Sequence, residues 1–163
     1  MRVAALADVH GNAPALAAVL EEVERIEVER LGPTCFAHGS PRSDEECVTK
    51  RTSDARVREF SAGVDATTFV TTHTHMQFDR HAAGLRLVNP GSVGLPYERA
   101  PAAYWALLGP DVELRHTDYD VEVAIASMLA TDDPRAELIA EMMRLPLAQD
   151  EVIEDAERRV FAG

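Results

Sequence analysis

Residues 2–12 read RVAALADVHGN, so a short apolar run stops abruptly at a polar turn. The apolar run over residues 2–7 predicts a β-strand, and the apolar residues after the turn recur at helical spacing. Asn12 is typical of a helix N-cap, and Pro14 is typical of a first helical turn. The pattern therefore predicts a strand, a polar turn and a helix over residues 13–30.

Two later stretches repeat the arrangement of an apolar strand followed by a turn that carries histidine. Residues 34–42 read TCFAHGSPR, and residues 66–75 read ATTFVTTHTH. Thr, Val and Phe favour extended structure, so we expect strands over 34–37 and 66–71. The strand at 34–38 is expected to form a right-handed βαβ unit with the first strand and the helix between them.

The rest of the chain predicts further helices and strands. A surface helix is expected within residues 43–62, around Val57 and Phe60. The other expected elements are a strand at 85–88 before the turn-rich stretch 89–94, a hairpin of 102–108 and 112–116 that turns at Gly109-Pro110-Asp111, and helices at 121–129, 135–145 and 151–161. We expect one domain over residues 1–163, with a sheet core in 1–117 and a helical part in 118–163.

Composition narrows the class of protein. Of 163 residues, 46% are hydrophobic and 27% are charged, which is typical of a folded globular chain. No stretch approaches the ~20 apolar residues of a membrane span, so we expect a cytoplasmic protein with no membrane partner. Lys and Arg number 16 against 28 Asp and Glu, and the net charge of −12 argues against nucleic acid as a stable partner. Cys35 and Cys47 are expected to be free thiols.

The three polar turns contain residues that bind metals. Asp8 and His10 follow the first strand, His38 follows the second, and His73 and His75 follow the third. Ligands of open α/β sheets bind where strands end, so neighbouring parallel strands would bring these five side chains together. Imidazole with carboxylate suits Zn, Fe or Mn better than Ca or Mg.

Each turn alone also fits a structural role. Asp-x-His after a strand can serve as a turn and helix cap, and His38 can be a satisfied, partly buried histidine. His81 and His116 have no such context, and we expect them to be structural. The three turns together, with the stretch 89–94 behind them, favour a metal site.

With these residues in view, the chain resembles the calcineurin-like metallophosphoesterase superfamily, in its small bacterial phosphodiesterase-like branch. The matching pieces cover most of residues 1–130 and are LADVHGN at 6–12, AHGSPR at 37–42, THTH at 72–75 and VNPGSVG at 88–94. The resemblance implies an α/β (α+β) fold, a β-sandwich flanked by helices, here internally truncated and with a helical C-terminal tail. It also implies a two-metal site at strand ends.

By position, the resemblance makes Asp8, His10 and His75 ligands of a first metal, and His38 and His73 ligands of a second. It implies hydrolysis of small phosphomonoester or phosphodiester substrates by metal-activated water. Divalent Mn, Fe or Zn would serve as the cofactor. We further expect Arg42 and Asn12 to contact the phosphate or to support the site.

The chain departs from the family in one segment. The family has a Gly-Asp motif, whose Asp bridges both metals, and a Gly-Asn-His motif, and neither occurs between Arg30 and His38 or later. Of the four protein ligands that the resemblance implies for each metal, the chain keeps three for the first metal and two for the second. Asp8 is the one carboxylate among these five. We therefore expect one bound ion rather than two. Thr72 stands where the family usually has Gly.

Two functions follow from this pattern. The first is a metal-dependent phosphoesterase with impaired activity; the second is an inactive remnant that serves as a mononuclear metal-binding or interaction module. A third explanation is a reading frame that has lost a segment, which resequencing between the codons for Arg30 and Cys35 would test. Since the family's absent strands would cover apolar surface, we also hypothesise self-association into a homo-oligomer.

Overall fold

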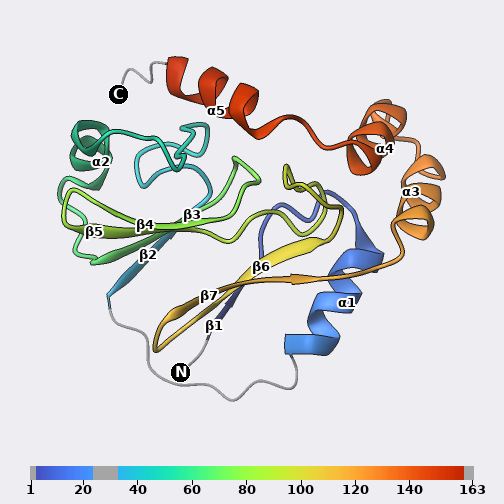
Figure 1. Cartoon of the computed structure of the whole chain (residues 1–163), viewed down its shortest axis with the longest axis horizontal. Coiled ribbons are helices and arrows are strands. Elements are labelled where there is room, and N and C mark those ends of the chain that lie inside the picture. Colours follow the sequence, from blue (N-terminus) through green and yellow to red (C-terminus); the bar gives the residue numbers. More distant parts are fainter. Residues whose placement is uncertain (1–2, 24–32, 160–163) are drawn as a thin grey trace.

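The computed structural model describes residues 3–23 and 33–159, and it contains two β-sheets and five helices (Figure 1). The strands are β1 (Val3–Ala5), β2 (Thr34–Ala37), β3 (Thr68–Thr71), β4 (Phe78–Ala82), β5 (Leu85–Asn89), β6 (Ala103–Leu108) and β7 (Val112–Thr117). The helices are α1 (Ala13–Val23), α2 (Asp54–Ser61), α3 (Val121–Leu129), α4 (Ala136–Arg144) and α5 (Gln149–Arg158).

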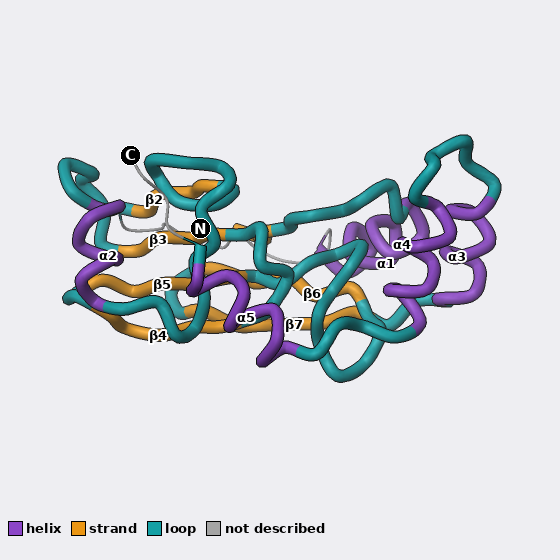
Figure 2. The backbone as a smooth tube through the Cα atoms, turned by 90° about the horizontal axis from the view of Figure 1, so that it is seen from above, coloured by secondary structure: helices purple, strands orange, loops and turns teal. Residues whose placement is uncertain are grey.

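The strands form a three-stranded and a four-stranded sheet. The first has the order β1-β6-β7 and is antiparallel throughout. The second has the order β2-β3-β5-β4, in which β2, β3 and β5 are parallel and β4 runs antiparallel to β5. Helices α1, α3 and α4 gather at one end of the molecule and α2 lies at the other, as two perpendicular views show (Figures 1 and 2).

Apolar contacts join the two sheets and attach the helices to them. Ala5 and Ala106 of the smaller sheet pack with Val70 and Val88 of the larger one. On the far sides, α2 covers the larger sheet around Phe60, whereas α1 covers the smaller sheet around Trp105 (the two clusters also include Val57, Phe69, Leu87, Val19 and Leu107). Two packed sheets flanked by helices confirm the predicted fold class.

Most predicted elements are confirmed, with shifted ends. The second strand, β2, and the first helix of the C-terminal part, α3, have the predicted bounds, and the hairpin is β6 with β7. Val57 and Phe60 lie in α2 as expected, and both side chains are buried. The predicted extension of the first helix to Arg30, and of the last helix to Phe161, falls in part outside the described residues.

The expected βαβ unit is wrong. Among the described residues, β1 pairs only with β6, in antiparallel register with Ala5 opposite Ala106. β2 pairs with β3 in the other sheet, so β1 and β2 are not neighbours in one sheet. The three strands that carry the histidine turns are therefore not all parallel neighbours. Their ends meet instead because the two sheets pack together.

The sequence pattern missed β4. Its residues are Phe78-Asp79-Arg80-His81-Ala82, of which only the first and last are buried. Three successive polar residues obscure the alternation that marks a half-buried strand. His81 is exposed on this strand, in line with its assignment to no site.

Within the two described ranges, no helix is both long and apolar enough to cross a membrane.

We expect Leu87→Ala to lower the free energy of unfolding by about 2–5 kcal/mol, because Leu87 of β5 is fully buried in the core cluster that the larger sheet forms with α2. Urea denaturation would measure the loss. The matched control is Leu114→Ala on β7, where the side chain is 38% exposed and a loss under about 1 kcal/mol is expected. Equal losses in the two variants would contradict the assignment of this core.

Candidate metal centre

The turn after β1 holds Asp8 and His10 in left-handed backbone, with φ of 52° and 49°. Asn12 ends this turn and caps α1, because its Oδ1 accepts a hydrogen bond from the backbone N–H of Ala15 at 3.1 Å. The predicted N-cap is thus confirmed. Its Nδ2 donates to the Gly94 carbonyl and the Tyr119 hydroxyl, at 3.2 and 3.0 Å. Asn12 is therefore engaged within the protein, and its contact with a phosphate stays a prediction.

The other two turns lie side by side because β2 and β3 are parallel neighbours. Ala37 is opposite Thr71 at their ends, and the backbone N–H of Thr72 donates to the His38 carbonyl at 2.9 Å. His73 and His75 also have left-handed backbone, with φ of 72° and 58°. Parallel pairing thus sets His38 directly beside the His73–His75 turn.

Residues 89–95 support the first turn from behind. The Asp8 carbonyl accepts hydrogen bonds from the Ser92 hydroxyl and the Gly94 N–H, at 2.9 and 3.1 Å. Gly94 lies so close to the first turn that a Cβ there would be 1.8 Å from the carbonyl oxygen of Val9. Only glycine fits this position, which explains one residue of the VNPGSVG stretch.

The structure brings all five predicted ligands together in two connected groups. Ligand atoms of Asp8, His10 and His75 all lie within 4.8 Å of one another. The Nε2 atoms of His10 and His75 are 3.2 Å apart, and His75 Nε2 is 3.6 Å from Asp8 Oδ1. In the second group, His38 Nε2 is 3.0 Å from His73 Nδ1.

Asp8 connects the two groups. Its Oδ1 is 3.7 Å from His38 Nδ1, and its Oδ2 accepts a hydrogen bond from the backbone N–H of His73 at 3.3 Å. Burial raises the pKa of Asp8, but the hydrogen bond and charge of His75 and the charge of His38 outweigh it, so the pKa lies below its usual value. Asp8 therefore carries a negative charge between the two pairs of imidazoles.

The donor chemistry fits a transition metal. His75 Nδ1 lies 2.7 Å from the Leu95 carbonyl, so with its proton on Nδ1 the imidazole would donate to that oxygen and offer the Nε2 lone pair to a metal beside Asp8 and His10. Burial, with the charge of the neighbouring histidine in each case, lowers the pKa of His10 and of His73. Neutral imidazole is the form that binds metals.

Backbone strain is concentrated at these positions. Five described non-glycine residues have positive φ, and four of them are Asp8, His10, His73 and His75. Such conformations cost on the order of 1–3 kcal/mol each and cluster at functional sites. The strain therefore favours a functional role for the centre.

Two supporting residues were not foreseen from the sequence. The Tyr97 ring stacks on His75, with centroids 4.8 Å apart and planes at 30°. The Thr72 hydroxyl lies 2.9 Å from His38 Nδ1 and donates to the His38 carbonyl at 3.0 Å. The departure from Gly at position 72 was the only signal for Thr72, and no pattern in the sequence indicated Tyr97.

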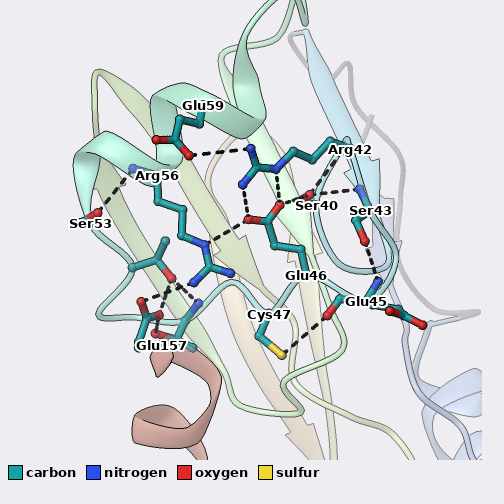
Figure 3. Close-up of polar contacts among 12 residues, drawn as sticks. Ser40, Arg42, Ser43, Glu45, Glu46, Cys47, Ser53, Arg56, Glu59 and Glu157 are labelled. Atoms are coloured by element: carbon teal, nitrogen blue, oxygen red, sulfur yellow. Dashed lines mark hydrogen bonds and ion pairs between the residues drawn. The ribbon is translucent and has the colours of Figure 1, made fainter. Parts of the chain in front are cut away.

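Arg42 is bound to Glu46, as Figure 3 shows. Its Nε and Nη2 reach the two carboxylate oxygens at 2.8 and 2.7 Å, while Ser40 and Arg56 also donate to Glu46. Burial raises the pKa of Glu46, yet these hydrogen bonds lower it to about 2. Arg42 thus stabilises the loop that follows His38, and a direct contact with substrate stays a prediction.

The two-sheet core flanked by helices is shared with solved structures. The structure of a metallophosphoesterase from Sphaerobacter thermophilus matches with a TM-score of 0.72 and 18% identity, over 90% of this chain and 100% of that one. A hypothetical protein from Pyrococcus horikoshii OT3 matches with a TM-score of 0.58 and 18% identity, over 76% of this chain and 52% of that one.

The metallophosphoesterase-like fold expected from the sequence is therefore confirmed. No protein-family profile matches the chain. No curated protein matches it by sequence. At 18% identity, the structural likeness concerns the fold, and the function is argued from the centre itself.

We expect Glu46→Gln to lower the free energy of unfolding by about 3 kcal/mol near neutral pH, because it leaves two arginines without their buried anion. The pKa of Glu46 is about 2 in the folded state against a usual 4.5. The stabilisation is therefore complete above that usual value and is lost as the pH falls toward 2. Urea denaturation at several pH values should show wild type and variant converging in acid.

The control for this prediction is Glu59→Gln. Glu59 is also near Arg42, at 3.7 Å, but its side chain is 64% exposed. Exposed ion pairs contribute at most about 1 kcal/mol, so a small loss is expected at every pH. A gap between wild type and Glu46→Gln that stays constant down to the acid limit would contradict the role of the Glu46 carboxylate.

Proposed function

We propose that the protein is a metal-dependent phosphoesterase that hydrolyses small phosphomonoesters or phosphodiesters. The observation that carries the proposal is the meeting of Asp8, His10 and His75 within 4.8 Å, although they come from turns 65 residues apart. The metallophosphoesterase-like fold supports it, because these turns follow strands at the seam between the two sheets.

Asp8, His10 and His75 would hold the metal, with His38 and His73 beside them. A divalent metal bound there would activate water and would neutralise charge on the phosphoryl oxygens. The chain's own residues orient this set. The Leu95 carbonyl fixes the imidazole of His75, and the Thr72 hydroxyl fixes that of His38. The backbone N–H of His73 holds the Asp8 carboxylate in place.

One ion per chain is the number we propose. Two dications near each other need bridging oxygens to reduce their repulsion, and Asp8 is the one carboxylate among the five predicted ligands. Two histidines and one carboxylate suit Mn, Fe or Zn. His38 and His73 would then act on the phosphate or on water rather than hold a second ion.

The alternative is an inactive module that binds a metal or a partner. The same single carboxylate favours it, because a lone ion lacks the paired arrangement of two-metal phosphoesterases. Hydrolysis separates the two proposals. The expectations of a cytoplasmic location, and of no stable nucleic-acid partner for so acidic a chain, stay predictions from the sequence.

We expect His75→Ala to lower kcat/KM for an aryl phosphodiester by about 100-fold or more in the presence of Mn, because it removes a ligand that is buried and oriented by Leu95. The matched control is His81→Ala, which removes an exposed histidine from β4 and should leave the rate unchanged. Equal rates for wild type and His75→Ala would remove the centre from the reaction.

Metal binding gives a second test that needs no turnover. Calorimetry with Mn or Zn should give about one ion per chain, and Asp8→Asn should weaken the affinity by about tenfold or more because the anion is lost. About one ion without hydrolysis would favour the inactive module. About two ions with hydrolysis would contradict the mononuclear proposal while supporting the enzyme.

A further inference from the structure

Helices α3 and α4 form a groove that begins at the metal centre. We name it the His10 groove; it is lined by His10, Leu95, Met128, Leu138 and Ile139 and has a volume of about 490 Å³. The two helices pack against each other at one end of the molecule (Figure 2). Arg135 and Asp133 lie on its rim. A ligand at His10 therefore has a largely apolar hollow beside it.

Two other cavities adjoin the centre, and their linings differ in charge. The one next to His73 has a volume of about 400 Å³ and includes Glu151 and Asp155 with Arg159. Its two carboxylates against one arginine give a net negative lining, which disfavours an anionic ester. The cavity next to Asp8 and His38, of about 410 Å³, runs along β1 and β2.

The charges of Asp133 and Arg135 cancel at the His10 groove, and the Arg135 guanidinium is a cation beside it. The Arg135 guanidinium is paired with Asp133, with Nε and Nη2 at 3.1 and 3.0 Å from its carboxylate oxygens. A guanidinium has five N–H donors, so the same side chain can also donate to an oxygen of a phosphoester. The Arg135 side chain is 72% exposed.

We propose that the His10 groove binds the apolar organic group, aryl or alkyl, of a phosphoester whose phosphoryl group lies at Asp8, His10 and His75. This inference rests on the proposed function and names the substrate class for that centre. Leu138 carries much of the contact, because its side chain is 57% exposed on the groove wall and would be covered by the ligand. Covering apolar surface stabilises the complex in proportion to its area.

The test is calorimetry of the Mn-loaded protein with two phosphonates that cannot be hydrolysed, phenylphosphonate and methylphosphonate. Both place an anionic head at the centre, and only the first carries a large apolar group. We expect phenylphosphonate to bind about tenfold more tightly than methylphosphonate. In Leu138→Gln the ratio should fall to about two- or threefold, while the methylphosphonate affinity, which reports an intact centre, should not change.

Two leucines of similar exposure serve as matched controls. Leu129 of α3 is 47% exposed and is not part of the groove lining, and Leu147 is 46% exposed in the cavity next to His73. Leu129→Gln and Leu147→Gln should both keep the tenfold ratio. Loss of the ratio in Leu147→Gln instead of Leu138→Gln would place the organic group beside His73 and overturn the inference.

The remaining outcomes separate this inference from the proposed function. Equal affinities for the two phosphonates in wild type would overturn the groove as a subsite while leaving the phosphoesterase proposal in place. Failure of both phosphonates to bind the Mn-loaded protein would overturn the phosphoesterase proposal, and this inference with it.

Discussion

The Asp8 carboxylate is the contact on which the geometry of the centre depends. It follows a strand of the smaller sheet, yet its nearest polar neighbours, His38, His73 and His75, follow strands of the larger sheet. The centre therefore spans the seam between the sheets. The distances between its side chains depend on the packing of Ala5 and Ala106 against Val70 and Val88. A change that weakens this packing would therefore also change the geometry of the predicted ligands.

The sequence was informative where local chemistry determines structure. Asn12 was identified as a cap because its short side chain can reach a free N–H group of the helix, and the α3 segment was identified by its apolar spacing. The five predicted ligands were found because each follows a strand. Pairing between distant strands cannot be read in this way, and β1 was therefore assigned the wrong neighbour. Residue types also do not show that Tyr97 stacks on His75 or that the Leu95 carbonyl orients it, since both contacts depend on how the backbone folds.

The acidity of the chain makes the local arrangement of charge important. The net charge of −12 repels an anionic ester at long range. The centre offsets this with four imidazoles around one carboxylate, a set that becomes positive when it holds a divalent cation. With Asp8 as the one carboxylate among the five predicted ligands, such a centre would hold a metal less firmly and attract phosphate more strongly. The two effects would oppose each other in activity.

Helix α5 is hydrogen-bonded to the loop that follows His38. Glu157 accepts hydrogen bonds from Thr49 and Thr52, both at 2.6 Å, and lies 3.7 Å from Arg56, which in turn donates to Glu46 (Figure 3). Ser40, two residues beyond His38, donates to the same carboxylate. Removing residues at the carboxyl end, or adding a purification tag that displaces this helix, would thus disturb the position of His38, more than a hundred residues away in the sequence. An affinity handle on this protein is better placed elsewhere.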